Sequence, residues 1–533
     1  MKQFHKMHRA TALVLFALCL PMMNFAQNFI IDMHNYGSMR AFHSRNTTDY
    51  SVWELIEHDC SASYSDEMVG AFDKMSKHSQ ANFEALMEGK IGIAFVSFET
   101  YERPFFSNGL MKVDKYVGTY SCLTGIVPEA AAPYISDRDY FKDFVDYYHY
   151  LKNQSRFPFT SLDGTYSFRM IDSKASLREV IQNGSELGIV LTITGGHLLG
   201  HSVFIENNLT ESADYQKLVM KNILRLKGSY PLIDNTTELL AEPVLYIKLA
   251  SNFNNGICGS ARTFPEAQER IFKQMPAYNH IDGNFETFGK KVVQALLSKA
   301  NGRRILIDVS GMSLASRRQF YGYRDELNKA DDNIPIIASH VGISGKSWDD
   351  PIYLIEDNKT KNKDSYLNHW MHNLSREDIK TIHASKGLIG LQINPQALCG
   401  DLAIEEANSM IPGTKQHREV YVKSVMANIL MIVSCVNEKS AWDMITIGSN
   451  FDNLKAVIPM YATAEDLPDL RKDLYNFMKS PTDVFELFTA NEVKRLLFGH
   501  NPQDLVNKIF TANALSFLEE NLPENAIAKS TNE

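Results

Sequence analysis

Eight short apolar runs, separated by segments with helical periodicity, constrain the fold of this chain more than any other feature of its sequence. The runs are rich in Ile, Val and Leu, as expected of parallel strands that are buried on both faces of a sheet. Helix-like stretches return the chain between nearly all of them, which predicts a (β/α)8 TIM-like barrel. The runs cover residues 29–33, 91–98, 187–194, 243–250, 304–310, 334–340, 388–393 and 443–449.

One of the helical segments has both of its ends marked. Ser375 and Asp378 have the spacing of a capping box, and Gly387 can end the helix. A doubly wound open sheet is the alternative fold, and it is disfavoured because no Gly-rich phosphate loop follows the first apolar run. We expect helices at residues 67–88, 140–152, 215–226, 284–300, 316–329, 375–387, 419–436, 480–498 and 503–521.

The chain has 533 residues, of which 44% are hydrophobic, and this is enough for one large core. We expect a single domain over residues 27–525, followed by a tail at 526–533. The long spacings between some runs predict insertions that decorate the barrel, at about 99–166, 345–370 and 400–415. Aromatic residues in the first insertion favour a packed element, and a lid over the barrel mouth is the alternative.

The N-terminus has the pattern of a targeting segment. Lys2, Lys6 and Arg9 precede an apolar run at 12–20, which is short for a membrane span and typical of a signal peptide. We therefore expect residues 1–26 to be removed and the protein to be exported, either periplasmic or secreted. An uncleaved anchor is the alternative, and no membrane span is expected after the leader.

Charge and cysteine content exclude some functions. The net charge of -9 and the isoelectric point near 6.0 argue against a nucleic-acid-binding surface. The five cysteines after the leader show no CxxC metal pair, so scattered buried thiols are favoured, with one disulfide as the alternative. They are Cys60, Cys122, Cys258, Cys399 and Cys435.

The carboxyl ends of barrel strands are where catalytic and binding residues gather. His34 and His340 stand at the ends of the first and sixth runs. Each could be a hydrogen-bonded core residue, but two histidines on one barrel rim raise the prospect of a functional site. Asp32 and Asp308 lie inside runs, where a buried hydrogen-bonding role is expected.

Several motifs in chain order resemble those of the membrane (renal) dipeptidases, a branch of the metal-dependent hydrolase barrels. "IIDMHNY" is similar to the opening D-G-H-N-D strand of that family, and "LTITGGHLLG" to its E-G-G-H segment. "ILIDVSGMS" resembles the D-L-S-H-V-S strand, "PIIASHVGIS" the P-x-I-x-S-H-S strand, and "ITIGSNFDN" the G-S-D-F-D-G strand. The resemblance runs from about residue 29 to 520 and implies the barrel fold with dipeptide hydrolysis at two zinc ions.

The resemblance also implies which positions would hold zinc. His34 and His340 match metal histidines of the family. The other four metal positions are substituted, and they are Tyr36, Thr194, Gly311 and Asn450. Catalytic zinc usually takes three protein ligands, so this chain is expected to bind no zinc or one.

Further site residues are implied in the same way. Asp452 remains beside the substituted acid at Asn450, and the two are the candidate catalytic residues. Ser251 stands at the substrate-contacting histidine of the family, and His197 follows the third run, so both are candidate substrate-binding residues.

Three functions stay open. The first is a dipeptidase-like barrel that has lost dizinc chemistry and binds a small peptide-like ligand. The second is an active hydrolase with one metal or altered ligands, for which His34, His340 and His197 could form a three-histidine site. The third is a partner-binding protein that uses the insertion at 99–166. The oligomeric state is not predicted.

Overall fold

The computed structural model describes residues 29–45, 50–57, 78–105, 134, 136–162, 164–262, 273, 278–329, 331–350, 362–453 and 456–526. The expected leader, the end of the tail, Cys60 and Cys122 lie outside these residues, as do large parts of the expected insertions at 99–166 and 345–370.

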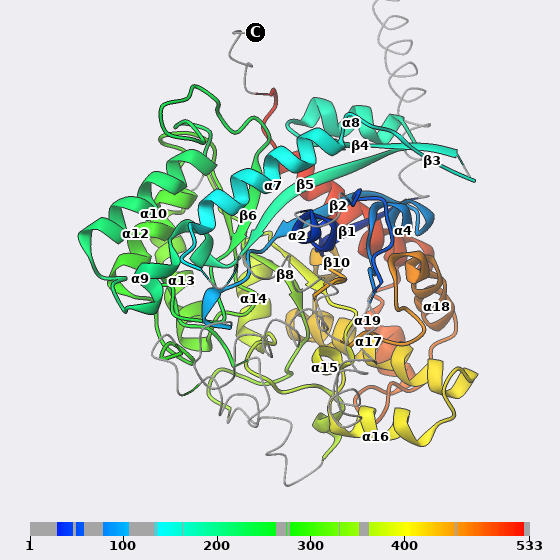
Figure 1. Ribbon diagram of the computed structural model, residues 1–533. Coiled ribbons are helices and arrows are strands. Elements are labelled where there is room, and N and C mark those ends of the chain that lie inside the picture. The colour runs from blue at the N-terminus through cyan, green and yellow to red at the C-terminus, as the bar shows by residue number, and fades with distance from the viewer. Residues whose placement is uncertain are drawn as a thin grey trace, which may run out of the picture.

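Eight parallel strands close into a barrel at the centre of the molecule (Figure 1). Around the ring the order is β1, β10, β9, β8, β7, β6, β5 and β2, and β2 pairs with β1. The pairing of β2 with β5 closes the sheet, which confirms the predicted barrel and excludes the doubly wound alternative. The strands are β1 (Ile30–Asn35), β2 (Ile91–Phe98), β5 (Glu186–Thr194), β6 (Val244–Lys248), β7 (Leu306–Asp308), β8 (Ile337–Val341), β9 (Leu388–Leu391) and β10 (Ile445–Ile447).

A short hairpin that was not predicted extends the sheet outside the barrel. β3 (Phe159–Ser161) pairs antiparallel with β4 (Gly164–Met170). β4 then runs parallel to the first half of β5, where Ser167 is opposite Glu186. Before this hairpin, α7 (Tyr140–Gln154) buries its aromatic side chains, so this part of the first insertion is a packed element.

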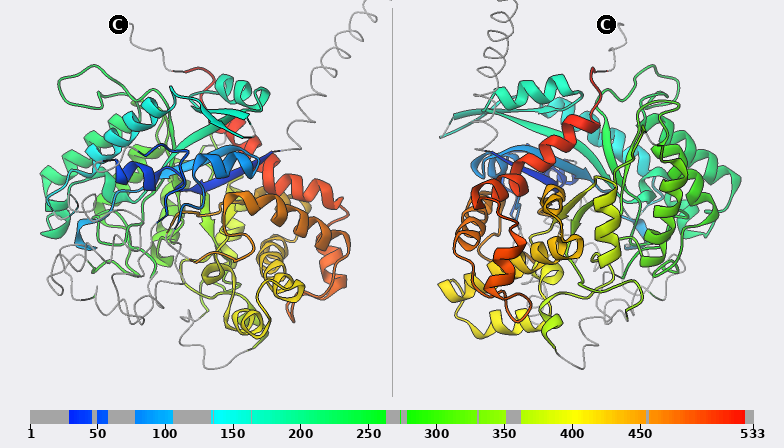
Figure 2. Two further views of the ribbon diagram at one scale, coloured as in Figure 1. Left: turned by 45° about the vertical axis from the view of Figure 1, so that its right-hand side comes forward. Right: turned by 180° about the vertical axis from the view of Figure 1, so that it is seen from behind.

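Helices surround the barrel and pack on one another in chain order (Figures 1 and 2). α10, α12 and α13 lie together on one side, and α16, α17 and α18 on the opposite side (Figure 1). The α-helices are α2 (Met39–Ser44), α4 (Phe83–Glu88), α7, α8 (Lys174–Gln182), α9 (Ser202–Glu206), α10 (Ala213–Leu226), α12 (Thr287–Leu297), α13 (Leu314–Leu327), α14 (Arg376–Ala384), α15 (Pro395–Leu398), α16 (Asp401–Ser409), α17 (Lys415–Val436), α18 (Leu467–Lys479), α19 (Ala490–Leu496), α20 (Pro502–Asn507) and α21 (Asn513–Asn521).

The last helices cover the amino-terminal end of the barrel. The hydroxyl of Thr511, in a π-helical turn at Lys508–Ala512, donates to the carbonyl oxygen of Phe29 at 2.6 Å. The side-chain amide of Asn513 donates to the carbonyl oxygens of Trp442 and Ile445 at 2.8 Å each. These bonds occupy backbone groups at the base of β1 and β10, so the opposite, carboxyl-terminal end is the candidate site.

The longest helix, α17, is apolar enough to cross a membrane by length and composition, but 67% of its most apolar window is buried inside the fold. It packs against α14, α16 and α18. A core helix passes the same test of length and composition, and the burial of α17 agrees with that role.

The capping box predicted for α14 is confirmed. The hydroxyl of Ser375 accepts from the amide of Asp378, and the carboxylate of Asp378 accepts from the amide of Ser375 at 2.9 Å. Asp378 also forms a buried ion pair with Arg317 of α13 at 3.1 Å, so the cap joins two neighbouring helices.

We predict that Ser375→Ala lowers the free energy of unfolding by about 1 kcal/mol, because the first turn of α14 loses its capping acceptor. Ser409→Ala is the matched control, since Ser409 is exposed at the last residue of α16, and a change within about 0.5 kcal/mol is expected. Urea unfolding of both variants measures the difference. Equal losses in the two would contradict the role given to the cap.

Candidate functional site

Two histidine rings stack at the carboxyl-terminal end of the barrel. His34 lies in β1 and His340 in β8, and their ring centroids are 3.9 Å apart at an interplanar angle of 20°. His34 is fully buried, and His340 is 7% exposed. The barrel therefore brings together the two histidines that the sequence singled out.

The hydrogen bonds of His34 determine its tautomer. Tyr246 donates its hydroxyl proton to the carbonyl oxygen of Met33 at 2.7 Å, because a carbonyl can only accept. The Nδ1 atom of His34, which lies 3.1 Å from the same hydroxyl, must then be the donor. The other nitrogen, Nε2, carries a lone pair and has no hydrogen-bond partner among the described residues.

His34 is also held neutral. Burial lowers its pKa well below the ordinary value, and the positive charge of Lys248 lowers it further. A neutral imidazole with a free Nε2 lone pair can accept a hydrogen bond or coordinate a metal.

The aspartates inside the strands have the buried role that was predicted. Asp32 accepts from the amide and the hydroxyl of Ser449 at 2.8 and 2.6 Å, and Asp308 accepts from the amide of Ser339 at 3.0 Å. Burial raises the pKa of Asp32 to about 6. Both carboxylates tie neighbouring strands together beneath the histidine pair.

Neutral hydroxyl groups occupy two of the substituted positions. The hydroxyl of Tyr36 donates to Oγ1 of Thr194 at 3.1 Å, and Oγ1 of Thr194 is 2.9 Å from the hydroxyl of Ser97. Burial, followed by the charge of Glu99, raises the pKa of Tyr36 well above its usual range. This cluster carries no negative charge at neutral pH, so it cannot bridge two cations.

A lysine side chain fills the space above the third substituted position. Gly311 has φ +74°, and a Cβ atom placed on it would lie 2.8 Å from Cε and 3.3 Å from Nζ of Lys248. Lys248 is the last residue of β6 and is half-buried. A side chain at residue 311 would require the end of the Lys248 side chain to move, and the positive φ of Gly311 would strain any residue other than glycine there.

Two glutamates follow β2 on the same rim. Glu99 is half-buried, and Glu102 is 2% exposed. Burial raises the pKa of Glu99. Among the effects that lower this pKa, the positive charge of Lys248 is the largest. Sequence reasoning missed Lys248 and Glu99, although a charged residue at the end of an apolar run was the available signal.

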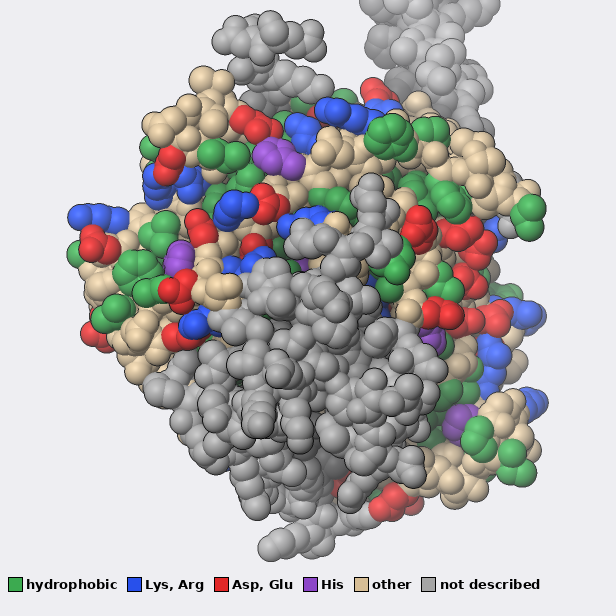
Figure 3. All heavy atoms as spheres, in the orientation of Figure 1, with side chains coloured by type: hydrophobic (Ala, Val, Ile, Leu, Met, Phe, Trp, Pro, Cys, Tyr) green, Lys and Arg blue, Asp and Glu red, His purple; other side chains and the backbone are tan. Residues whose placement is uncertain are grey.

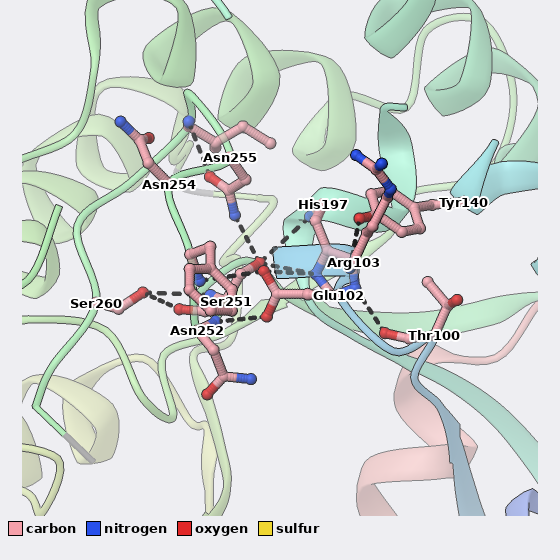
Figure 4. A network of polar contacts seen from close by, with 12 residues as sticks. Thr100, Glu102, Arg103, Tyr140, His197, Ser251, Asn252, Asn254, Asn255 and Ser260 are labelled. Carbon is pink, nitrogen blue, oxygen red and sulfur yellow. Dashed lines mark hydrogen bonds and ion pairs between the residues drawn. The ribbon is translucent and has the colours of Figure 1, made fainter. Parts of the chain in front are cut away.

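The network in Figure 4 braces the loop that follows β6. The carboxylate of Glu102 accepts from the backbone amides of Asn252 and Phe253 at 2.8 and 3.1 Å. Nδ1 of His197 is 3.0 Å from the hydroxyl of Ser251, and Nε2 is 2.9 Å from the carbonyl oxygen of Thr100.

These contacts leave the two candidate substrate-binding residues occupied. A carbonyl can only accept, so His197 donates from Nε2 and receives the Ser251 proton at Nδ1. The Ser251 hydroxyl also accepts from the side-chain amide of Asn255 at 2.8 Å. His197 has no free ring nitrogen for a metal, and the three-histidine site with His34 and His340 does not form.

The carboxylate of Asp452 lies in a buried ion pair and hydrogen-bond network. It accepts from Arg40 at 3.0 Å and from the backbone amides of Gln80 and Ala81 at 3.0 Å each. Asn450 is likewise occupied, because its side-chain amide donates to Gln392 at 3.1 Å. Both side chains thus hold the loop after β10, and the catalytic role of the pair stays a prediction.

The described residues do not fit a dizinc centre. Among them, no group of three or more His, Cys, Asp or Glu side chains could hold a metal ion. His34 presents a suitable lone pair, but Gly311, which has no side chain, stands at the position of a metal histidine of the resembling family, and the Lys248 side chain lies beside it. A positive charge beside that position disfavours a divalent cation there.

Comparison with known proteins gives likeness at the level of overall fold. No family model and no curated protein matches the chain. A probable dipeptidase, PvdM, from Pseudomonas aeruginosa is 14% identical, with a TM-score of 0.41 over 81% of this chain and 88% of that one. A metallo peptidase from Rhodobacter sphaeroides, liganded with a phosphinate mimic of the dipeptide L-Ala-D-Ala, is 13% identical, with a TM-score of 0.44 over 90% and 99%. An amidohydrolase from Pseudomonas aeruginosa is 12% identical, with a TM-score of 0.43 over 93% and 98%.

We predict that Asp452→Asn lowers the free energy of unfolding by about 3 kcal/mol or more, because it removes the negative charge from a buried ion pair with Arg40. Asp443→Asn is the control, since that carboxylate is 57% exposed in its pair with Lys508 and is expected to cost less than about 1 kcal/mol. Denaturant unfolding measures both. A catalytic role for Asp452 would instead show as lost activity at unchanged stability.

A second prediction concerns pH. Burial raises the pKa of Glu102 from 4.5 to about 7. The folded state therefore holds a proton that the unfolded state releases, so this contribution to stability is complete below pH 4.5 and is lost as pH rises through about 7.

Glu102→Gln removes this titration. The wild type should lose stability relative to the variant between about pH 5 and pH 8, as measured by urea unfolding at both pH values. A constant difference between the two proteins at all pH values would show that Glu102 is ionised throughout.

Proposed function

We propose that this protein is an exported, dipeptidase-like barrel that has lost dizinc hydrolysis and binds a small peptide-like ligand at the carboxyl-terminal mouth of the barrel. The observation that carries the proposal is the Lys248 side chain above Gly311, with Nζ 3.3 Å from the position of a Cβ atom. It places a lysine side chain beside a position at which the resembling family has a metal histidine.

The other substitutions support the same conclusion. Tyr36 and Thr194 hydrogen-bond to each other at 3.1 Å as neutral hydroxyls, at positions where the resemblance implies carboxylates. The retained scaffold still presents His34, Glu99 and Lys248 at one end of the barrel. These groups can bind polar atoms of a ligand without activating a water molecule.

The alternative is hydrolysis with a single metal. It is favoured by the free Nε2 atom of His34 and the stacked ring of His340. It is disfavoured because His197 uses both ring nitrogens within the protein. Two histidines fall short of the three protein ligands that catalytic zinc usually takes.

The test is calorimetric titration of chelator-treated protein with a panel of unmodified dipeptides, followed by a hydrolysis assay with and without added zinc. We expect saturable binding without metal and no hydrolysis in either condition. Zinc-dependent release of amino acids would support the single-metal alternative. Absence of binding across the panel would overturn the proposal.

A further inference from the structure

The β3–β4 hairpin and its surroundings carry an unusual share of the exposed apolar side chains. Leu162, in the turn of the hairpin, is fully exposed, Phe157, just before β3, is 68% exposed, and Leu55 is 53% exposed. Single exposed apolar residues are common on protein surfaces. These three, however, are among the four most exposed large hydrophobic side chains of the described residues. Their concentration in one region indicates a surface that contacts something else.

The hairpin is packed against the protein on its other side. The ring of Phe159, in β3, stacks on Trp53, with the ring centroids 5.3 Å apart and an interplanar angle of 7°. Phe168, in β4, contacts the same tryptophan at a centroid distance of 6.1 Å. Trp53 is buried, and Leu55 follows it by two residues. The exposed side chains therefore project from a fixed base.

The strand register gives the direction in which the hairpin points. β4 runs parallel to β5, and Ser167 is opposite Glu186, the first residue of β5. The turn at Leu162 comes five residues before Ser167, so it extends about 16 Å past the start of β5, at about 3.3 Å per residue. The hairpin thus projects past the amino-terminal end of the barrel, on the side away from the mouth, and Figure 1 shows it reaching beyond α8.

The amino-terminal part of the chain joins the barrel at the same end. β1 is parallel to β2 and β10 and begins at Ile30, so residues 1–28 precede the amino-terminal end of the barrel. They include the apolar run at 12–20, which has the pattern of a leader. The hairpin and the start of β1 lie on the same side of the molecule in Figures 1 and 2. Export through this leader brings that side next to a bilayer.

Charge and area both favour a lipid surface as the partner of the hairpin. Arg156, next to Phe157, is exposed and forms no ion pair within the described part of the chain, whereas Arg169 of β4 pairs with Glu186 at 3.2 Å. A guanidinium group beside an aromatic ring suits the boundary between lipid phosphates and acyl chains. A phenylalanine side chain buries only about 150–250 Å². A stable interface between two proteins needs about 1,200 Å² or more, which a projecting turn does not offer.

We propose that the β3–β4 hairpin is a membrane-contact element that inserts Phe157 and Leu162 into the acyl boundary of an anionic bilayer, while Arg156 binds lipid phosphate. Two inserted side chains give reversible binding and not permanent attachment. Docked in this way, the barrel holds its mouth away from the bilayer and open to solvent. The inference goes beyond the proposed ligand binding and does not depend on it.

A tryptophan placed at the tip tests the contact directly. Leu162→Trp is compared with Ile411→Trp, because Ile411 is 74% exposed but lies beside α16, far from β3 (Figure 1). Each full-length variant is mixed with vesicles of phosphatidylcholine and phosphatidylglycerol, and with the same vesicles brominated on their acyl chains. Bromine should quench the added fluorescence at residue 162 and leave that at residue 411 unchanged.

Vesicle binding of a double variant measures the contribution of the two side chains. Phe157→Ser combined with Leu162→Ser should weaken binding to the same vesicles by at least about tenfold, because each apolar side chain leaves water on insertion. Ile411→Ser is the matched control and should bind as the wild type does. The leader is the same in all of these proteins, so it cannot produce a difference between them.

Equal quenching at residues 162 and 411, or quenching at neither, would overturn the inference. Equal vesicle binding by the wild type and the double variant would also overturn it. A wild-type dimer in sedimentation velocity that the double variant lacks, without vesicle binding by either, would overturn it and assign the hairpin to a second copy of the chain. None of these outcomes alters calorimetric binding at the mouth, so failure of this inference and failure of the proposed function are distinguishable.

Discussion

The chemistry of this barrel depends on one steric and electrostatic relation, the Lys248 side chain lying against Gly311. Residue 311 is held at positive φ without a side chain, and the lysine occupies the volume that a side chain would need. An ammonium group beside this position repels a divalent cation and attracts an anion. The substitutions at Tyr36 and Thr194 agree with the loss of a metal pair at this end of the barrel. A bridging carboxylate is not needed where no two cations are held.

The polar groups around the mouth divide into those that hold the protein and those that can meet a ligand. Some of these side chains form hydrogen bonds within the protein, namely those of His197, Ser251 and Asn450. Buried polar groups normally have hydrogen-bond partners within the protein, so a buried group without one is a candidate for contact with a ligand. Nε2 of His34 is one of several such buried atoms among the described residues, and the half-buried Lys248 lies at the same end of the barrel. On the face shown in Figure 3, acidic and basic side chains are interspersed over much of the described surface, and several acidic side chains lie close together on the right-hand side.

The barrel could be predicted because each of its strands is a continuous apolar run, and burial on both faces is what such runs imply. The β3–β4 hairpin could not, because its residues are half-buried and mix polar with aromatic side chains. Asp452 was assigned to catalysis because it neighbours a substituted metal position. Its actual partner, Arg40, is remote in sequence, and such an ion pair leaves no local pattern.

We propose that the substituted metal positions and the Lys248 side chain together exclude the two zinc ions that the motifs would otherwise imply. The most direct test is mass spectrometric measurement of zinc in purified, tag-free protein that has been exposed to zinc and then desalted. We expect well under about 0.1 zinc ion per chain, because two histidines beside a lysine provide too few ligands. A value near two, the number a dizinc hydrolase requires, would contradict it.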